Sequence, residues 1–205
     1  MRQHTSVTRR QQKTLMNGLL GTFLLKDFEA FFDDYRLKNT LAHEALMAFE
    51  HLLPSLNEFF DLYEGLIDAK NVKISWYSYA NITSSGDYIR AKSLYYNEPA
   101  FSDVSINMSE EESEDYNTDE GACFGKVLML INVKFENSSS VDLALIQWYD
   151  FRYKNDLRRL YKYDCPLLQI TNTYNVVPIE SIIELVQVVQ RAEHHDEYFV
   201  NIYMF

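Results

Sequence analysis

Two long apolar stretches, residues 124–135 and 141–151, constrain the fold of this chain more than any other feature. The segment between them, residues 136–140, is short and polar and has the composition of a turn. Two strand-like runs on either side of such a connection are typical of a β-hairpin. We therefore expect residues 124–151 to form a pair of long antiparallel strands.

Shorter strand-like segments lie on both sides of this hairpin. A cluster of turn residues at 81–86 separates the first two of them, and residues 178–182 favour a turn or a single helical turn between two of the later ones. Strands are predicted at residues 72–76, 87–91, 174–177, 185–190 and 198–205. Several short strands at this spacing favour a β barrel or sandwich.

The first 71 residues have a helical pattern instead. Apolar residues from Met16 to Tyr35 recur with the i, i+3, i+4, i+7 spacing of one helical face, although Gly18 and Gly21 weaken the first turns. A second helix is expected over residues 41–53, with Thr40 as its N-cap.

Pro54 is expected to end this second helix, because proline interrupts the helical hydrogen bonds. Ser55 and Glu58 then fit the capping box of a third helix. The apolar faces of the three helices are rich in Phe and Leu, so we expect the helices to pack on the β part or on a second copy of the chain.

Helices and strands are therefore segregated along the chain, which favours an α+β fold over a parallel α/β sheet. We predict an N-terminal helical segment at 1–71, of which residues 1–13 are disordered, followed by a mostly antiparallel β barrel at 72–205. The chain has a net charge of −11. Much of it lies in an acidic loop at about 107–121, where a block of like charges is typical of a solvated segment.

Five short motifs in the β part resemble the bromo-adjacent homology (BAH) domain in kind and in order. They are the runs GDYIR at 86–90, FGKV at 124–127, QWY at 147–149, VPIESI at 177–182 and EYFV at 197–200. The resemblance covers residues 86–205 and implies a β barrel that binds other molecules without catalysing a reaction. The acidic loop departs from the family pattern.

The whole chain is also similar to the C-terminal tails of large fungal transposon-encoded proteins, through residues 114–121, 148–151 and 197–201. This second resemblance implies a transposon origin without a catalytic core.

Some BAH domains bind chromatin, including methylated lysine held in an aromatic cage, so the resemblance implies a protein partner such as a histone tail. Aromatic faces with a nearby carboxylate attract a methylammonium group. The candidate peptide-binding residues are Tyr88, Tyr116, Trp148, Tyr149, Asp115 and Asp150. Because Trp148 and Tyr149 are adjacent on a predicted strand, they face opposite sides, and core packing of at least one is the alternative.

A basic patch supplies a different hypothesis, a DNA-contacting accessory domain of a transposase-like protein. The residues that would contact phosphates are Arg152, Lys154, Arg158, Arg159 and Lys162. Residues 72–205 carry 11 basic and 20 acidic residues, however, and nucleic-acid-binding domains usually have a basic excess. A docking surface between domains is therefore the favoured interpretation of the patch.

No catalytic, nucleotide-binding or metal-binding signature is present in the sequence. His194, His195, Asp196 and Glu197 are adjacent rather than spaced as metal ligands, and we interpret them as a turn. Two cysteines make neither a disulfide framework nor a zinc site. We therefore expect no enzyme, no cofactor and no metal, with an unrecognised enzyme or a non-functional gene fragment as further alternatives.

The sequence has no apolar run of membrane-spanning length and no signal-type segment, so we expect no membrane contact and an intracellular location. The chromatin hypothesis makes that location nuclear. The pattern does not indicate the oligomeric state.

Overall fold

The computed structural model describes residues 14–61, 71–82, 86–107, 122–136, 139–152, 159–160, 165–192 and 194–201. The predicted disorder of residues 1–13 and nearly all of the predicted acidic loop fall outside these ranges. The helical elements are η1 (Leu25–Asp27), α1 (Phe28–Lys38), α2 (His43–Asp61) and η4 (Ile179–Ser181).

Twelve strands fill most of the remaining described residues. They are β1 (Thr14–Leu24), β2 (Lys73–Ile82), β3 (Tyr88–Tyr95), β4 (Glu98–Phe101), β5 (Asp103–Asn107), β6 (Ala122–Lys134), β7 (Ser140–Phe151), β8 (Arg159–Leu160), β9 (Cys165–Pro178), β10 (Ile182–Val186), β11 (Val188–Arg191) and β12 (His194–Val200).

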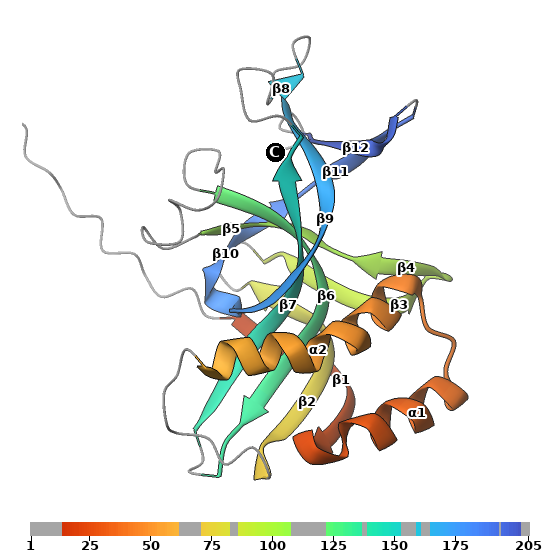
Figure 1. Ribbon diagram of the computed structural model, residues 1–205, viewed down its shortest axis with the longest axis vertical. Helices are drawn as coiled ribbons and strands as arrows, with labels where there is room; N and C mark the ends of the chain where they lie inside the picture. The colour runs from red at the N-terminus through yellow and green to blue at the C-terminus, as the bar shows by residue number, and fades with distance from the viewer. Residues whose placement is uncertain are drawn as a thin grey trace, which may run out of the picture.

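The strands form one sheet along the path β11-β12-β9-β7-β6-β2-β3-β4. Strand β1 pairs with β2, β5 bridges β6 and β10, and β8 pairs with β9. Each of these pairings is antiparallel. The sheet curls strongly, as a half-barrel (Figure 1). The predicted α+β class with a mostly antiparallel sheet is confirmed.

The predicted central hairpin is confirmed as β6 and β7, which pair from Phe124–Tyr149 to Lys134–Ser140. Both faces of β6 are buried. Leu128 and Met129 belong to the core beneath the helices, whereas Val127 and Leu130 belong to a second core inside the curl. A strand buried on both sides needs apolar residues at successive positions, which explains the continuous apolar run in the sequence.

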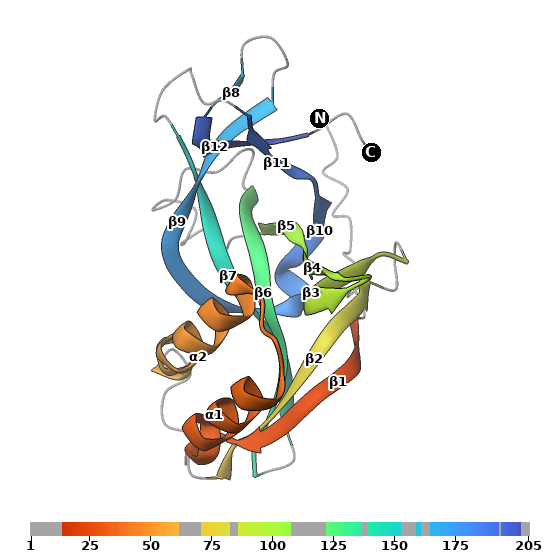
Figure 2. The same cartoon turned by 90° about the vertical axis from the view of Figure 1, so that its right-hand side faces the viewer.

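Helices α1 and α2 pack on the first of these cores, and α2 lies across the middle of the sheet (Figures 1 and 2). The Phe49 ring of α2 meets the Trp76 ring of β2 edge to face, with centroids 5.0 Å apart. The Ser55 hydroxyl donates a hydrogen bond of 3.0 Å to the Tyr174 carbonyl of β9. The apolar helical faces are thus covered by the sheet of the same chain.

The predicted helix from Met16 to Tyr35 is wrong over its first half, because residues 14–24 form β1. Gly18 has a φ of +66°, and a Cβ there would lie 2.1 Å from the Ser78 hydroxyl oxygen. Gly21 passes the Phe31 ring so closely that a Cβ would lie 2.7 Å from it. The two glycines therefore allow β1 to pack closely against Ser78 and Phe31. The helical spacing of the apolar residues did not indicate this role.

The predicted helix end at Pro54 is also wrong, because α2 runs through Pro54 to Asp61. An interior proline costs a helix about 3 kcal/mol. Phe49, Leu52, Leu56 and Phe59 are buried on both sides of it, and each buried side chain contributes about 1.5–3 kcal/mol. The free energy gained by packing therefore outweighs the cost of the interior proline. Ser55 forms a hydrogen bond to β9 instead of capping a third helix.

Three short strands, β4, β5 and β8, and most of β9 were not predicted. A two-residue turn at Tyr96 and Asn97, with φ of 49° and 70°, joins β3 to β4. The predicted turn at residues 178–182 is confirmed as η4. The predicted turn at His194–Glu197 is wrong, because these residues begin β12, which ends at Val200.

Candidate functional site

Trp148 and Tyr149, the central residues of the predicted cage, both lie in the core. Each is 6% exposed, and they belong to different apolar clusters on opposite faces of β7. The Trp148 indole N–H donates a hydrogen bond of 2.9 Å to the side-chain oxygen of Asn175. The Tyr149 hydroxyl donates one of 2.9 Å to the Asp103 carboxylate. The structure does not bring these two rings into one cage.

Asp103 is the centre of a partly buried polar cluster that joins three strands. Its carboxylate lies 3.1 Å from the Lys126 ammonium of β6 and accepts the Tyr149 hydroxyl of β7. Burial raises the pKa of Asp103 above its ordinary value, whereas the Lys126 charge and hydrogen bond and the Tyr149 hydrogen bond lower it. Burial also raises the pKa of Tyr149, and the Asp103 charge adds to that rise. Lys126 and Tyr149 both bind the Asp103 carboxylate, so the cluster holds β5, β6 and β7 together.

The other predicted cage residues are not gathered around Trp148. Asp150 is half-buried, and its carboxylate accepts the backbone N–H of Phe151 at 2.8 Å. Tyr88 is exposed on β3. Tyr116 and Asp115 lie outside the described residues.

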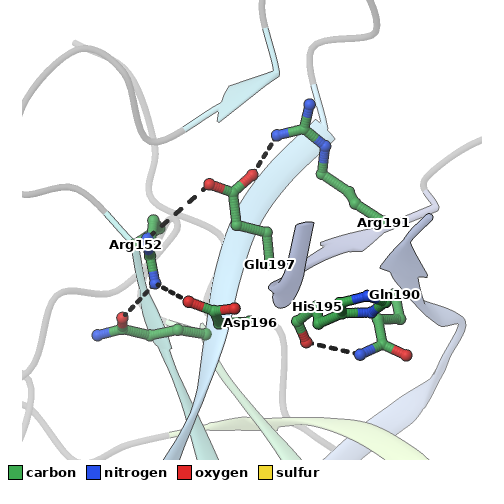
Figure 3. A network of polar contacts seen from close by, with 7 residues as sticks. Arg152, Gln190, Arg191, His195, Asp196 and Glu197 are labelled. Atoms are coloured by element: carbon green, nitrogen blue, oxygen red, sulfur yellow. Dashed lines mark hydrogen bonds and ion pairs between the residues drawn. The ribbon is translucent and has the colours of Figure 1, made fainter. Parts of the chain in front are cut away.

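The described member of the basic patch, Arg152, is engaged within the fold (Figure 3). Its guanidinium lies 3.6 Å from the Asp196 carboxylate and 3.9 Å from that of Glu197, and it donates to Gln169 at 3.4 Å. Glu197 also pairs with Arg191. The carboxylates of β12 thus neutralise Arg152. Lys154, Arg158 and Lys162 lie outside the described residues, as does the side chain of Arg159.

An open pocket of about 310 Å³ lies instead over β2 and β3. Its lining consists of Ser78, Tyr79, Tyr88, Arg90, Lys92 and Tyr95. Tyr79 and Arg90 are register partners, and they alternate with the buried Ala80 and Ile89. Because strand side chains alternate between faces, Tyr79, Arg90 and Lys92 share the outer face of the sheet. Strand geometry therefore brings the aromatic and basic side chains together.

Arg90 is the organising residue of this tyrosine–arginine pocket. Its guanidinium carbon lies 5.8 Å from the centroid of the Tyr88 ring and 5.1 Å from that of Tyr95. The Tyr88 ring in turn meets Tyr79 edge to face, with centroids 5.7 Å apart. Cation–π contacts of this kind fix the orientation of a guanidinium.

The pocket is positively charged on an otherwise acidic protein. Among the described residues its lining holds two cations and no carboxylate, and neither Arg90 nor Lys92 forms an ion pair within the described part of the chain. Tyr88 and Tyr95 are also 43% and 40% exposed, although large aromatic rings are usually buried. Two cations that lack an ion pair among the described residues, set between exposed rings, can bind an anionic group and an apolar one together.

Tyr88 was predicted from the sequence as a peptide-binding residue, whereas Arg90, Lys92 and Tyr95 were not. The signal was the alternation of Tyr88, Arg90 and Lys92 on one strand face, which extends beyond the predicted strand end at residue 91. Tyr79 and Tyr95 carry no local signal, because they join the pocket only through strand pairing and the turn to β4.

The pocket contains no paired catalytic groups in the described residues. No hydrogen bond joins two of its lining side chains there, so no hydroxyl is held against a base. Nor do three His, Cys, Asp or Glu side chains gather to hold a metal anywhere in the described ranges. The described helices include none of the length and apolarity that a membrane span requires.

Comparisons with protein-family models, with curated proteins and with solved structures return no match. The resemblance to BAH domains and the transposon origin therefore stay predictions.

Proposed function

We propose that this chain is a non-catalytic interaction module that binds a peptide segment of another protein in the tyrosine–arginine pocket. The observation that carries the proposal is the exposure of Tyr88 and Tyr95 around two cations that lack an ionic partner among the described residues. Tyrosine and arginine are the residues most enriched where protein surfaces bind partners. The residues that line the pocket favour binding through charge and aromatic stacking over catalysis of a reaction.

The pocket favours an acidic peptide over a basic one. Arg90 and Lys92 repel a lysine side chain, and the described lining residues supply no carboxylate to offset that repulsion. Binding to a histone tail stays a prediction, which the same experiment tests, and a nuclear location stays a separate prediction. The DNA-contacting alternative gains no support from Arg152, because Asp196 and Glu197 already neutralise it.

The test is binding of the purified chain to an array of unmodified, methylated and phosphorylated peptides that includes histone tails. We expect acidic peptides to bind, and we expect the double variant Arg90→Gln, Lys92→Gln to lose that binding while its thermal unfolding stays unchanged. Lys134→Gln is the matched control, because Lys134 is an exposed lysine at the far end of β6, outside the pocket.

Two outcomes would contradict the proposal. One is a folded protein that binds no peptide on the array. The other is equal binding by the double variant, which would place the binding surface elsewhere on the molecule.

A further inference from the structure

Resting on the proposed function, we propose that the tyrosine–arginine pocket binds a phosphorylated side chain of the partner peptide, with Arg90 and Lys92 as the phosphate-binding residues. The available donors of Arg90, the charge of the lining and the size of the pocket support this proposal.

The Arg90 guanidinium lies over two aromatic rings. Tyr88 and Tyr95 both lie within cation–π distance of it, at 5.8 and 5.1 Å from the guanidinium carbon. The N–H donors of a guanidinium point outward in its own plane, where they form a fork that matches two oxygens of a phosphate. In the described residues the Arg90 side chain makes one hydrogen bond, a long one of 3.4 Å to the Tyr88 carbonyl. Most of the fork is therefore available to a ligand.

Lys92 supplies a second positive charge next to this fork. It follows Arg90 by two positions on β3 and lines the same pocket. Alternate residues of a strand lie about 6.6 Å apart, and these two long side chains can span that distance to reach one anion. A phosphate monoester carries about −1.5 to −2 charges near neutral pH. The two cations match that charge, whereas a single carboxylate would leave one cation unpaired.

A single phosphorylated side chain also suits the pocket better than a nucleic-acid strand. The volume of about 310 Å³ is at the small end of the range for ligand pockets. The protein as a whole carries a net charge of −11, which repels a ligand with many phosphates. The acidic residues next to the pocket in sequence, Asp87 and Glu98, flank β3 at its two ends and would repel phosphates that extend beyond the pocket.

The experiment compares degenerate peptide libraries centred on phosphotyrosine or phosphoserine with their unphosphorylated twins and with a twelve-residue oligothymidylate. We expect phosphorylation to tighten binding at least tenfold in the wild-type protein and in Lys134→Gln. Arg90→Gln should abolish this preference. Arg90→Lys keeps the charge without the fork, and it should retain only part of the preference. Circular dichroism and thermal unfolding show whether each variant is folded.

Each other outcome overturns the inference in a distinguishable way. Equal binding of phosphorylated and unphosphorylated peptides would refute the phosphate site while leaving the peptide-binding module intact. Tighter binding of the oligothymidylate than of any peptide would identify a nucleic-acid site. Binding of no peptide would refute the inference together with the proposed function.

Discussion

The guanidinium carbon of Arg90 lies 5.1 Å from the centroid of the Tyr95 ring, at the end of β3 where the chain turns into β4. The contact joins a cation and an aromatic ring that are both accessible to solvent. Among the described residues that line the pocket, Arg90 carries the only guanidinium, and the contact orients it. If the pocket binds a ligand as proposed, we expect the contact to matter to that binding more than to folding.

Replacing Tyr95 by leucine removes this contact and leaves a side chain of similar bulk. We expect ligand affinity to fall about two- to five-fold, because an exposed cation–π pair contributes about 0.5–1 kcal/mol. The free energy of unfolding should change by less than about 0.5 kcal/mol, as is usual at a surface position. Isothermal titration and urea unfolding measure the two quantities. An unfolding change larger than the binding change would contradict this separation.

Replacing Tyr96 by asparagine should stabilise the β3–β4 turn. Tyr96 has a φ of 49° and is 87% exposed, so its backbone occupies the left-handed region without compensating burial. That region costs a residue with a Cβ about 1–2 kcal/mol, whereas asparagine tolerates it. We expect a gain of about 0.5–1 kcal/mol in urea unfolding. A loss of stability would show that the Tyr95–Tyr96 ring contact matters more than the backbone conformation.

Pro54→Ala should likewise raise the free energy of unfolding. Pro54 is exposed within α2, so the change deletes no buried contact and restores one helical hydrogen bond. The interior proline costs about 3 kcal/mol, but it also restricts the unfolded chain, so we expect a net gain of about 1–2 kcal/mol. Thermal and urea unfolding should agree on the sign. No gain would mean that Pro54 itself contributes to the fit of α2 to the sheet.

The Asp103 cluster should give a measurable pH dependence of stability. Burial raises the pKa of Asp103 in the folded protein, so the folded state holds a proton more tightly than the unfolded state. The stability from this group is fully present below the unfolded pKa and is lost as the pH rises through the folded pKa. Asp103→Asn removes the titration and keeps an acceptor for the Tyr149 hydroxyl.

The stability of Asp103→Asn relative to wild type should therefore rise as the pH increases from about 3.8, the ordinary value of an aspartate. Urea unfolding of both proteins from acidic to neutral pH measures that difference. A difference that falls with pH would mean that Lys126 and Tyr149 lower the pKa by more than burial raises it.

The parts of the fold that local pattern determines could be predicted from the sequence. The β6–β7 hairpin and the apolar faces of α2 follow from apolar runs and helical spacing, which survive in the structure because both are buried. Strand β1 could not be predicted, because the helical spacing of its apolar residues is outweighed by the pairing with β2 across Gly18 and Gly21. The paired residues lie 49 to 68 positions apart in the sequence, a separation that no local pattern records.

The candidate site was harder to predict for the same reason. Trp148 and Tyr149 were prominent in sequence because they are large and adjacent, but size and β spacing equally describe core residues. Arg90 and Lys92 were inconspicuous among the charged residues of the chain. They belong to a candidate site because the pairing of β3 with β2 places Tyr79 beside them.

The most direct test of the central claim is a titration of the isotope-labelled protein with the tightest peptide from the array, followed by amide chemical shifts. We predict that the largest shifts fall on Tyr79, Tyr88, Arg90, Lys92 and Tyr95. Arg152, Asp196 and Glu197 should stay unshifted. Shifts concentrated around Arg152, with an undisturbed pocket over β2 and β3, would contradict this prediction.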